Sequence, residues 1–356
     1  MLRRRLTAFF VAIGLVLAAC GPEGPRSESG AELGGKLVIS SWGGSFSEAT
    51  RQSLAQPFGK ESGVDIQIVD APGEHLAQVA AQRKAGKVRW DVIDSLDGPT
   101  AALMAKRGLL ETLPGDVRTR LQKSTSEDMV LDYGVMQSSI ANVLGCNRQK
   151  ARSCPKSLAD FFDTQRFPGP RMMYNAPIDN LYTAWAASGR VPENPTDADV
   201  DRAFALLEKI KPSVKVWWSS GDESQQALRS GQAVMGVVWN GRAKQLIDEG
   251  LQLDVVWKGA FYGPAYTVVV KDAPNKKAAF AYLEYYASHP AAEAQWAKAV
   301  SYGVANPKAL DQLPAETARY LPEHPSHVDQ LVTPNIDWFT ANNDEINKRW
   351  KEFLGK

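Results

Sequence analysis

The sequence predicts an α/β fold, in which a mostly parallel sheet carries helices on both faces. Between residues 36 and 106, short apolar segments with the character of strands alternate with longer segments of helical character. Strands are expected at 36–40, 64–69 and 90–93, and helices at 47–60, 73–85 and 99–106. This alternation is typical of parallel sheets, because each helix returns the chain to the end of the sheet where the next strand begins.

The first 20 residues have the composition of an export signal. Three arginines at positions 3–5 precede an apolar run over residues 6–17, which is too short for a stable membrane span. The Leu-Ala-Ala-Cys20 sequence that follows resembles the lipobox of bacterial lipoproteins, in which the cysteine carries a diacylglycerol. We therefore expect residues 1–19 to be a signal peptide and Cys20 to anchor a periplasmic protein to a membrane. An ordinary signal peptide with a coincidental cysteine is the alternative.

The composition of the mature chain indicates a flexible N-terminal segment and a charge close to neutral. Residues 20–35 are rich in Gly, Pro, Ser and Glu, with too few apolar side chains to form a core, so they are expected to be a flexible tether. Without residues 1–19 the chain has 38 basic and 40 acidic residues. This balance lacks the electrostatic footprint of a nucleic-acid-binding protein, so no nucleic-acid partner is expected.

The second part of the chain repeats the pattern after a long apolar segment at 134–144, which is suited to carry the chain from one domain to another. Helices are expected at 178–188, 199–210, 222–230 and 276–288, and strands at 214–218, 234–239, 255–257 and 266–270. The tail from 316 to 354 is expected to be mainly helical. Because ligands bind beyond the carboxyl ends of parallel strands, Trp42–Ser45 and Ser95–Gly98 are candidate site segments.

Two cysteines remain if Cys20 is lipidated. Cys146 and Cys154 lie eight positions apart, and outside the cytoplasm such a pair favours a disulfide over two free thiols. Closing so short a loop would stabilise the fold by roughly 2–3 kcal/mol. Without a nearby histidine the pair does not form a zinc site, and no metal is expected.

Local motifs for catalysis or cofactor binding are not found in the sequence. Gly43–Ser47 fails the last position of the G-x-S-x-G hydrolase turn, and there is no phosphate-binding loop, G-x-G-x-x-G or H-E-x-x-H. His324 and His327 lie between prolines, where a solvated loop is favoured over a metal pair. We therefore expect neither a cofactor nor an enzyme.

Aromatic residues instead mark the candidate site. Trp42, Trp239, Tyr262 and Tyr302 each stand beside Gly, Ser, Asn or Pro at the end of a strand or in a connection. Taken together, they favour one shared pocket lined by aromatic rings. The adjacent tyrosines at 285–286 resemble those of ferric-ion-binding proteins, but a helix would place them in the core.

Several segments, in their order and spacing, resemble the substrate-binding proteins of bacterial ABC importers, in particular the spermidine/putrescine-binding type. They are the lipoprotein start, Ile39–Gly44, Trp90–Ile93, Val237–Gly241 and Ser301–Gly303. The resemblance extends from about residue 36 to 354. It implies a two-lobed periplasmic-binding-protein fold of type II, in which each lobe is a mixed, mostly parallel sheet with flanking helices and hinge crossovers join the lobes.

The same resemblance implies where the lobes divide and what the protein contacts. Lobe 1 would comprise residues 36–137 and 265–306, and lobe 2 residues 138–264 and 307–356. The protein would be a non-enzymatic monomer that captures a small nitrogenous organic solute, polyamine or amino-acid-like, in an aromatic-lined cleft between the lobes. It would deliver this solute to ABC permease subunits.

The resemblance also supplies candidate ligand contacts. In polyamine binders, aromatic rings sandwich the methylene chain and carboxylates hold the ammonium ends; Trp42, Trp239 and Tyr302 match the rings, and Asp179 matches a carboxylate at a helix start. Ser95 matches a serine after the third strand. The remaining expected contacts are Asp97, Asn240 and Tyr262.

Two departures from the polyamine pattern leave the solute open. No acid follows Tyr262, and Gly44 stands where a glutamate is expected. Fewer acids favour a small cation, or a zwitterion such as an amino acid, whose carboxylate would be held by Arg242 or by the helix start after Ser220. A ligand sensor and a carrier of ferric ion or an oxyanion are alternatives. An enzyme on the same fold would be favoured if Asp97 and Asp179 lay close together with shifted pKa values.

Overall fold

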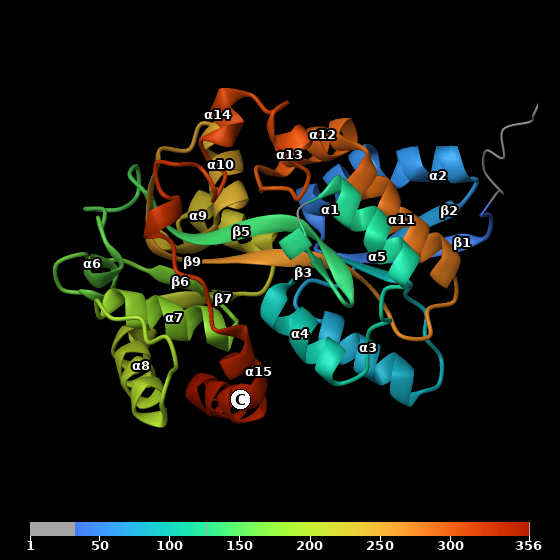
Figure 1. Cartoon of the computed structure of the whole chain (residues 1–356). Coiled ribbons are helices and arrows are strands. Elements are labelled where there is room, and N and C mark those ends of the chain that lie inside the picture. Colours follow the sequence, from blue (N-terminus) through green and yellow to red (C-terminus); the bar gives the residue numbers. More distant parts are fainter. Residues whose placement is uncertain (1–32, 126, 356) are drawn as a thin grey trace, which may run out of the picture. The chain divides into compact units, whose positions relative to one another are not determined.

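The computed structural model describes residues 33–125 and 127–355, so the expected signal peptide, Cys20 and most of the tether lie outside the described residues. Within them, nine strands form one sheet in the order β2-β1-β3-β9-β5-β8-β6-β7, with β4 paired to β5 (Figure 1). The strands are β1 (Lys36–Ser41), β2 (Asp65–Asp70), β3 (Val92–Asp97), β4 (Val130–Leu131), β5 (Gly134–Asn147), β6 (Arg171–Tyr174), β7 (Val214–Trp218), β8 (Met235–Trp239) and β9 (Leu253–Val269).

The sheet consists of two parallel wings joined by an antiparallel pair. The first wing contains β2, β1 and β3, which run parallel to one another. The second wing contains β8, β6 and β7, which are also parallel. Between the wings lie β9 and β5, the two longest strands, which pair antiparallel from Gly134 opposite Val268 to Asn147 opposite Leu253. The predicted α/β class with a mixed, mostly parallel sheet is therefore confirmed.

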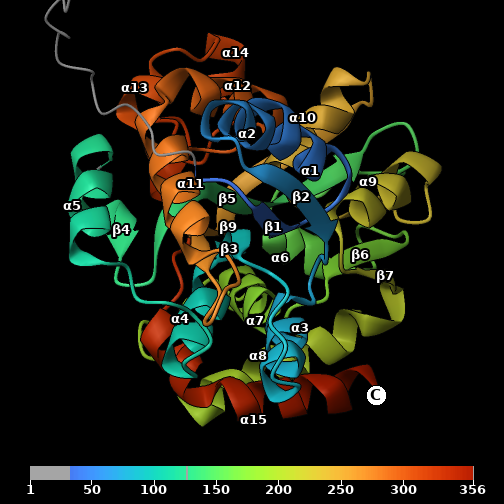
Figure 2. The same cartoon turned by 90° about the vertical axis from the view of Figure 1, so that its right-hand side faces the viewer.

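Helices cover both faces of this sheet. Figure 1 shows α9, α10 and α12 on one side of β5 and β9, and α3, α4, α7 and α15 on the other; Figure 2 shows the same layers after a quarter turn. The helices are α1 (Gly44–Thr50), α2 (Gln56–Ser62), α3 (His75–Lys84), α4 (Gly98–Lys106), α5 (Gly115–Ser124), α6 (Leu158–Phe162), α7 (Pro177–Ala187), α8 (Asp197–Ile210), α9 (Gly221–Ser230), α10 (Asn240–Asp248), α11 (Lys276–Ser288), α12 (Pro290–Val300), α13 (Pro307–Leu310), α14 (Ala315–Ala318) and α15 (Ile336–Leu354).

Most predicted elements are present, with several differences. The strands predicted separately at 255–257 and 266–270 are one strand, β9, which continues through Gly259, Gly263 and Pro264 because β5 pairs along its length. The helix predicted at 47–60 is a longer helical run that includes a π-helical turn at Arg51–Ala55. The tail is less helical than predicted, since a long helix is reached only at Ile336.

Ser95 lies inside a strand rather than in the loop predicted to follow it. β3 extends to Asp97, and its pairing with β9 shifts register between Ile93 and Leu96. Ser95 occupies this irregularity with a φ of 47°, a left-handed conformation that is uncommon for a residue other than glycine. The bulge turns the end of β3 so that the chain can begin α4 at Gly98.

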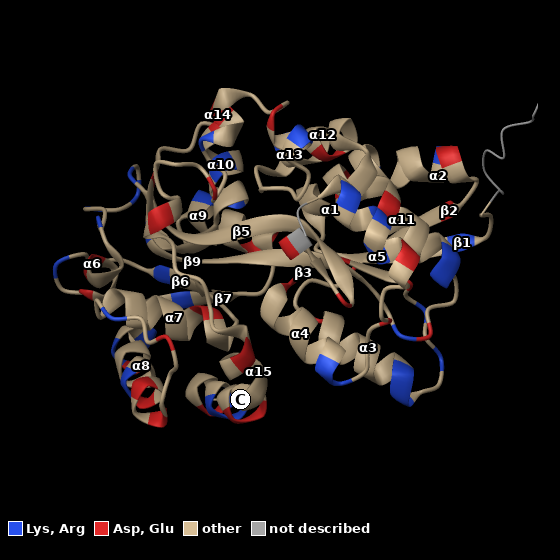
Figure 3. Cartoon of the chain, in the orientation of Figure 1, with Lys and Arg blue, Asp and Glu red and all other residues tan. Residues whose placement is uncertain are grey.

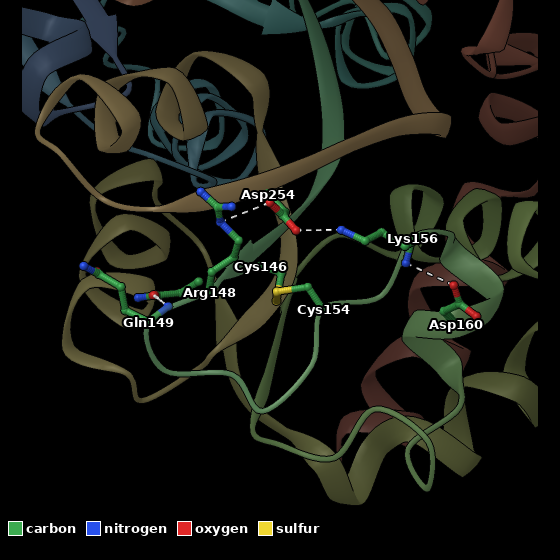
Figure 4. Close-up of a disulfide and its surroundings, with 8 residues drawn as sticks. Cys146, Arg148, Gln149, Cys154, Lys156, Asp160 and Asp254 are labelled. Atoms are coloured by element: carbon green, nitrogen blue, oxygen red, sulfur yellow. Dashed lines mark hydrogen bonds and ion pairs between the residues drawn. A yellow bond between two sulfur atoms is a disulfide. The ribbon is translucent and has the colours of Figure 1, made fainter.

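The predicted disulfide between Cys146 and Cys154 is present (Figure 4). It closes the turn between the end of β5 and the segment that leads into α6. Two cations on this turn, Arg148 and Lys156, contact Asp254 of β9 at 3.3 and 2.7 Å. The disulfide and these ion pairs therefore tie the turn to the adjacent strand.

The described surface mixes both signs of charge. Figure 3 shows that helices such as α8 and α15 carry basic and acidic residues side by side. Among the described residues, no helix is both long enough and apolar enough to span a bilayer.

Candidate ligand-binding site

A cavity of about 370 Å³ lies where the two wings meet. Its wall is built from the segments that follow β1, β2 and β3 in the first wing and β6, β7 and β8 in the second, together with β5, β9 and α15. These segments lie at the carboxyl ends of parallel strands, where ligands bind in sheets of this class. Residues distant in the sequence thus face one space.

Six of the predicted contacts line this cavity. They are Trp42, Ser95, Asp97, Asp179, Trp239 and Tyr302. They come from both wings and from the connection after α12, so the fold brings together side chains that are up to 260 positions apart in the sequence. Whether they contact a ligand remains a prediction.

The aromatic wall forms across the wings. Trp42 meets Trp239 edge to face, with 5.6 Å between the ring centres, and Tyr174 meets the same indole at 5.4 Å. The Trp42 indole nitrogen donates to the backbone oxygens of Asp94 and Ser95, both at 3.1 Å. The bulge in β3 thereby fixes the orientation of the tryptophan, and its indole N–H is not free for a ligand.

Two of the acidic residues that line the cavity, Asp97 and Asp179, form a pair. Asp97 caps the start of α4 by accepting from the Thr100 N–H at 2.9 Å, and Asp179 in the first turn of α7 accepts from the Asn142 side chain. Burial, and secondarily the nearby Asp97 carboxylate, raises the pKa of Asp179 to about 7. Burial likewise raises the pKa of Asp97. A cation placed between these groups would favour their ionised forms.

The ionisable lining is acidic. The carboxylates of Glu74, Asp97 and Asp179 line the cavity, and no Lys or Arg is among its described lining residues. His75 also lines it, but burial lowers the pKa of this histidine to about 4, so the ring is neutral at pH 7. The electrostatic character of the cavity therefore favours cationic groups.

Two predicted contacts, Asn240 and Tyr262, do not line the cavity. The Asn240 side chain accepts from the Ala141 N–H at 3.0 Å and donates to the backbone oxygens of Ser301 and Tyr320, both at 2.9 Å. It therefore links α10 to three distant segments. The Tyr262 hydroxyl donates to Glu323 at 3.0 Å. Both polar groups are engaged by segments that no local pattern would have placed beside them.

The candidates for holding a carboxylate are also engaged elsewhere. Arg242 contacts Asp222 and does not line the cavity. The Ser220 hydroxyl caps α9 by accepting from the Glu223 N–H at 3.2 Å. The described lining of the cavity thus provides no Lys or Arg for an anionic end of a ligand.

The alternative metal-binding residues lie in packed surroundings. Tyr286 is buried in α11, and Tyr285 stacks on His289 with 3.9 Å between ring centres. His327 stacks on Trp257, with ring centres 3.7 Å apart. None of these residues lines the cavity, and the described residues contain no cluster able to hold a metal ion.

Several lining residues had no local signal in the sequence. His75 begins α3, Tyr174 ends β6, and Asn142 lies within β5. Phe339, Asn343 and Asn347 reach the cavity from α15, close to the end of the chain. Only the tertiary fold places this helix against α4 and α7, the helices that begin at the acidic pair.

Comparison with known proteins identifies the family to which the chain belongs. Residues 53–322 match the family model described as bacterial extracellular solute-binding protein. The chain belongs to the bacterial extracellular solute-binding protein family. The recognition made from the sequence is confirmed, and so is the role of solute capture.

Relatives align over almost the whole solute-binding chain. The gamma-aminobutyric acid-binding protein of Pseudomonas aeruginosa is 29% identical over 329 residues, which cover 90% of this chain and 91% of the relative. The spermidine/putrescine-binding periplasmic protein of Escherichia coli is 22% identical over 306 residues, which cover 82% of this chain and 84% of the relative.

Solved structures of binding proteins share the fold of this chain to different degrees. A periplasmic binding protein of Agrobacterium tumefaciens R10 in complex with agropinic acid has a TM-score of 0.82 at 28% identity, over 90% of this chain and 99% of that one. A binding protein of Agrobacterium tumefaciens C58 in an open unliganded conformation has a TM-score of only 0.62, although it is 30% identical over the same shares. The chain therefore superposes better on the liganded neighbour than on the open unliganded one.

Proposed function

We propose that this solute-binding protein is a lipid-anchored periplasmic component of an ABC importer, which captures a small nitrogenous organic cation and delivers it to a permease. The observation that carries the proposal is the acidic, aromatic cavity, which is lined by three acidic residues, by no described Lys or Arg, and by rings from both wings. Ammonium groups are stabilised by carboxylates through charged hydrogen bonds and by aromatic faces through cation–π contact. The Escherichia coli relative is named for polyamines.

The proposed division into lobes follows the geometry of the two long strands. The boundaries 137/138 and 264/265 fall at positions that pair across the sheet, because Ser138 lies opposite Ala265 and Ser139 opposite Pro264. A hinge through paired positions lets both strands bend together. We therefore keep lobe 1 as 36–137 and 265–306, and lobe 2 as 138–264 and 307–356.

The acidic pair serves binding rather than catalysis in this proposal. Asp97 and Asp179 do interact and have raised pKa values, the feature that would have favoured an enzyme. A pair of this kind is equally what an ammonium group requires, and the family to which the chain belongs binds solutes.

Mass spectrometry of the ligand that co-purifies with the protein tests the solute class. We expect an amine. Recovery of a sugar or an inorganic anion would contradict the proposal.

A zwitterion such as gamma-aminobutyric acid is the second candidate, because the Pseudomonas aeruginosa relative is named for it. Titration calorimetry with putrescine and gamma-aminobutyric acid separates the two. We expect tighter binding of putrescine, since the described lining contains acidic residues but no Lys or Arg to pair with a carboxylate. The opposite order would favour the zwitterion.

A further inference from the structure

A buried arginine lies next to the site without entering it. Arg242, in the first turn of α10 and three residues after Trp239, is only 2% exposed, yet it does not line the cavity. Its guanidinium contacts Asp222 at 3.1 Å, Gln245 at 3.3 Å and the hydroxyl of Ser45. A charged group so deeply buried requires such partners, because an unpaired buried charge is costly.

These partners belong to both lobes. Asp222, Arg242 and Gln245 lie on α9 and α10 of lobe 2, whereas Ser45 lies on α1 of lobe 1. Ser45 also donates to Gln245 at 3.2 Å, and Gln245 donates to the backbone oxygen of Ala299 at 3.1 Å. Several polar contacts therefore cross between the lobes at one place.

The residue before Ser45 is shaped by the same contact. Gly44 has a φ of 54°, and a Cβ built on it would overlap the Asp222 carboxylate. Any larger residue at position 44 would push Asp222 away from lobe 1. In the turn after β1, Gly44 thus leaves room for the Asp222 carboxylate, and the next residue provides a hydroxyl for Arg242. Asp222 and Arg242 are already paired with each other on lobe 2.

We propose that Arg242, held by Asp222, is a positioning residue that docks Ser45 across the cleft and so holds the protein closed over its ligand. The Asp222–Arg242 pair lies within one lobe and persists when the lobes separate, whereas the contacts to Ser45 exist only on closure. The apparent affinity for a ligand depends on the fraction of molecules in the closed form, so losing the Ser45 contact weakens binding although Ser45 touches no ligand. This inference requires only lobe closure and holds for any ligand class.

An ion pair that does cross between the lobes makes a useful contrast. Arg107 at the end of α4 contacts Asp344 of α15 at 2.6 Å, but the Asp344 side chain is 88% exposed. Exposed ion pairs contribute little because solvent screens them. The Arg242 guanidinium is buried, although its partners Ser45 and Asp222 are exposed, so its contact with lobe 1 is assigned the larger part in closure.

The test uses Ser45→Ala, which removes one hydroxyl and leaves the buried charge paired with Asp222. We expect putrescine affinity, measured by calorimetry, to fall about tenfold, the value of a charged hydrogen bond. We also expect the radius of gyration from small-angle X-ray scattering, with and without putrescine, to be larger than in the parent. The melting temperature of the ligand-free protein should change little.

Arg229→Gln is the matched control. Its ion pair with Glu249 at 2.7 Å also joins α9 to α10 but does not cross between lobes, so affinity and scattering should remain those of the parent. Arg242→Gln should lower affinity at least as much as Ser45→Ala, and the double variant should add little to Arg242→Gln. Parent-like scattering of Ser45→Ala under both conditions would overturn the proposal, whatever the ligand proves to be.

Discussion

Trp239 belongs both to the wall of the cavity and to the packing of the second wing. It is 8% exposed and meets Trp42, Trp218 and Tyr174 edge to face. Its position at a strand end, followed by small and polar residues, favoured a cleft when it was considered together with Trp42, Tyr262 and Tyr302. The same reasoning did not hold for Tyr262, whose hydroxyl donates to Glu323, because a partner 61 positions away leaves no local trace.

Among the lining residues, loss of the Asp179 carboxylate should have the most direct effect on ligand affinity. For Asp179→Asn we expect the affinity for putrescine to fall by about tenfold or more, equivalent to the ~1.5 kcal/mol of a charged hydrogen bond. Calorimetry measures it. Asp197→Asn is the control, because Asp197 is an exposed acid in the first turn of α8 that does not line the cavity. An unchanged dissociation constant for Asp179→Asn would remove this carboxylate from the site.

Cation binding should depend on pH around neutrality. The pKa of Asp179 is raised to about 7, so below that pH the side chain is largely protonated and a cation must displace a proton. Affinity should therefore rise between pH 6 and pH 8, with proton release visible as a buffer-dependent heat. His75, with a pKa of about 4, and Tyr174, with a pKa raised well above 10, do not titrate in this range. A flat profile would contradict ionisation of the pair on binding.

At the scale of elements, the local sequence pattern predicted those helices and strands whose formation depends on their own residues. It failed for elements whose extent depends on pairing with a distant strand. Predicted helices such as 199–210 correspond to α8, which begins with a capping box at Thr196. In contrast, β9 was predicted as two strands because Gly259, Gly263 and Pro264 normally interrupt pairing. Pairing along β5 keeps the strand continuous through them. α15 supplies three cavity residues, but nothing local shows that it returns to the site.

The disulfide belongs to this scale as well. Replacing both Cys146 and Cys154 by Ser should lower the free energy of unfolding by about 2–3 kcal/mol, because the short loop they close is then unconstrained in the unfolded chain. Urea denaturation measures the loss. Putrescine affinity should remain that of the parent, since neither cysteine lines the cavity. A matching loss of affinity would mean that the turn communicates with the site.

For the whole molecule, the α/β class can be predicted from the alternation of strands and helices along the chain. The joining of both wings into one sheet cannot be predicted in this way. Alternation accounts for β2-β1-β3 and β8-β6-β7 as separate parallel wings. Nothing in the periodicity of residues 134–147 or 253–269 shows that these strands pair with each other and join the wings. That pairing is a property of sequence separations of more than one hundred residues, which pattern alone does not encode.

Membrane attachment is the other expectation at this scale. In cells expressing Cys20→Ala, we expect the protein to leave the membrane fraction or to retain its signal peptide, because the acceptor thiol of the lipobox is absent. Fractionation followed by immunoblotting, with metabolic labelling by a tritiated fatty acid, reads out both results. Labelled protein that remains in the membrane fraction despite Cys20→Ala would contradict anchoring through this cysteine.

The antiparallel pair of β5 and β9 has a consequence for anyone who would dissect this chain. Strands in each half of the chain form their backbone hydrogen bonds with strands encoded in the other half, as the pairing of Gly134 with Val268 illustrates. A truncated gene product that stops before β9 would present an unsatisfied row of amides and carbonyls along β5 and β3, and bare edges of this kind recruit other chains. Expression of either half alone should yield aggregates, so swapping specificity between relatives is better attempted by exchanging loops than by exchanging halves.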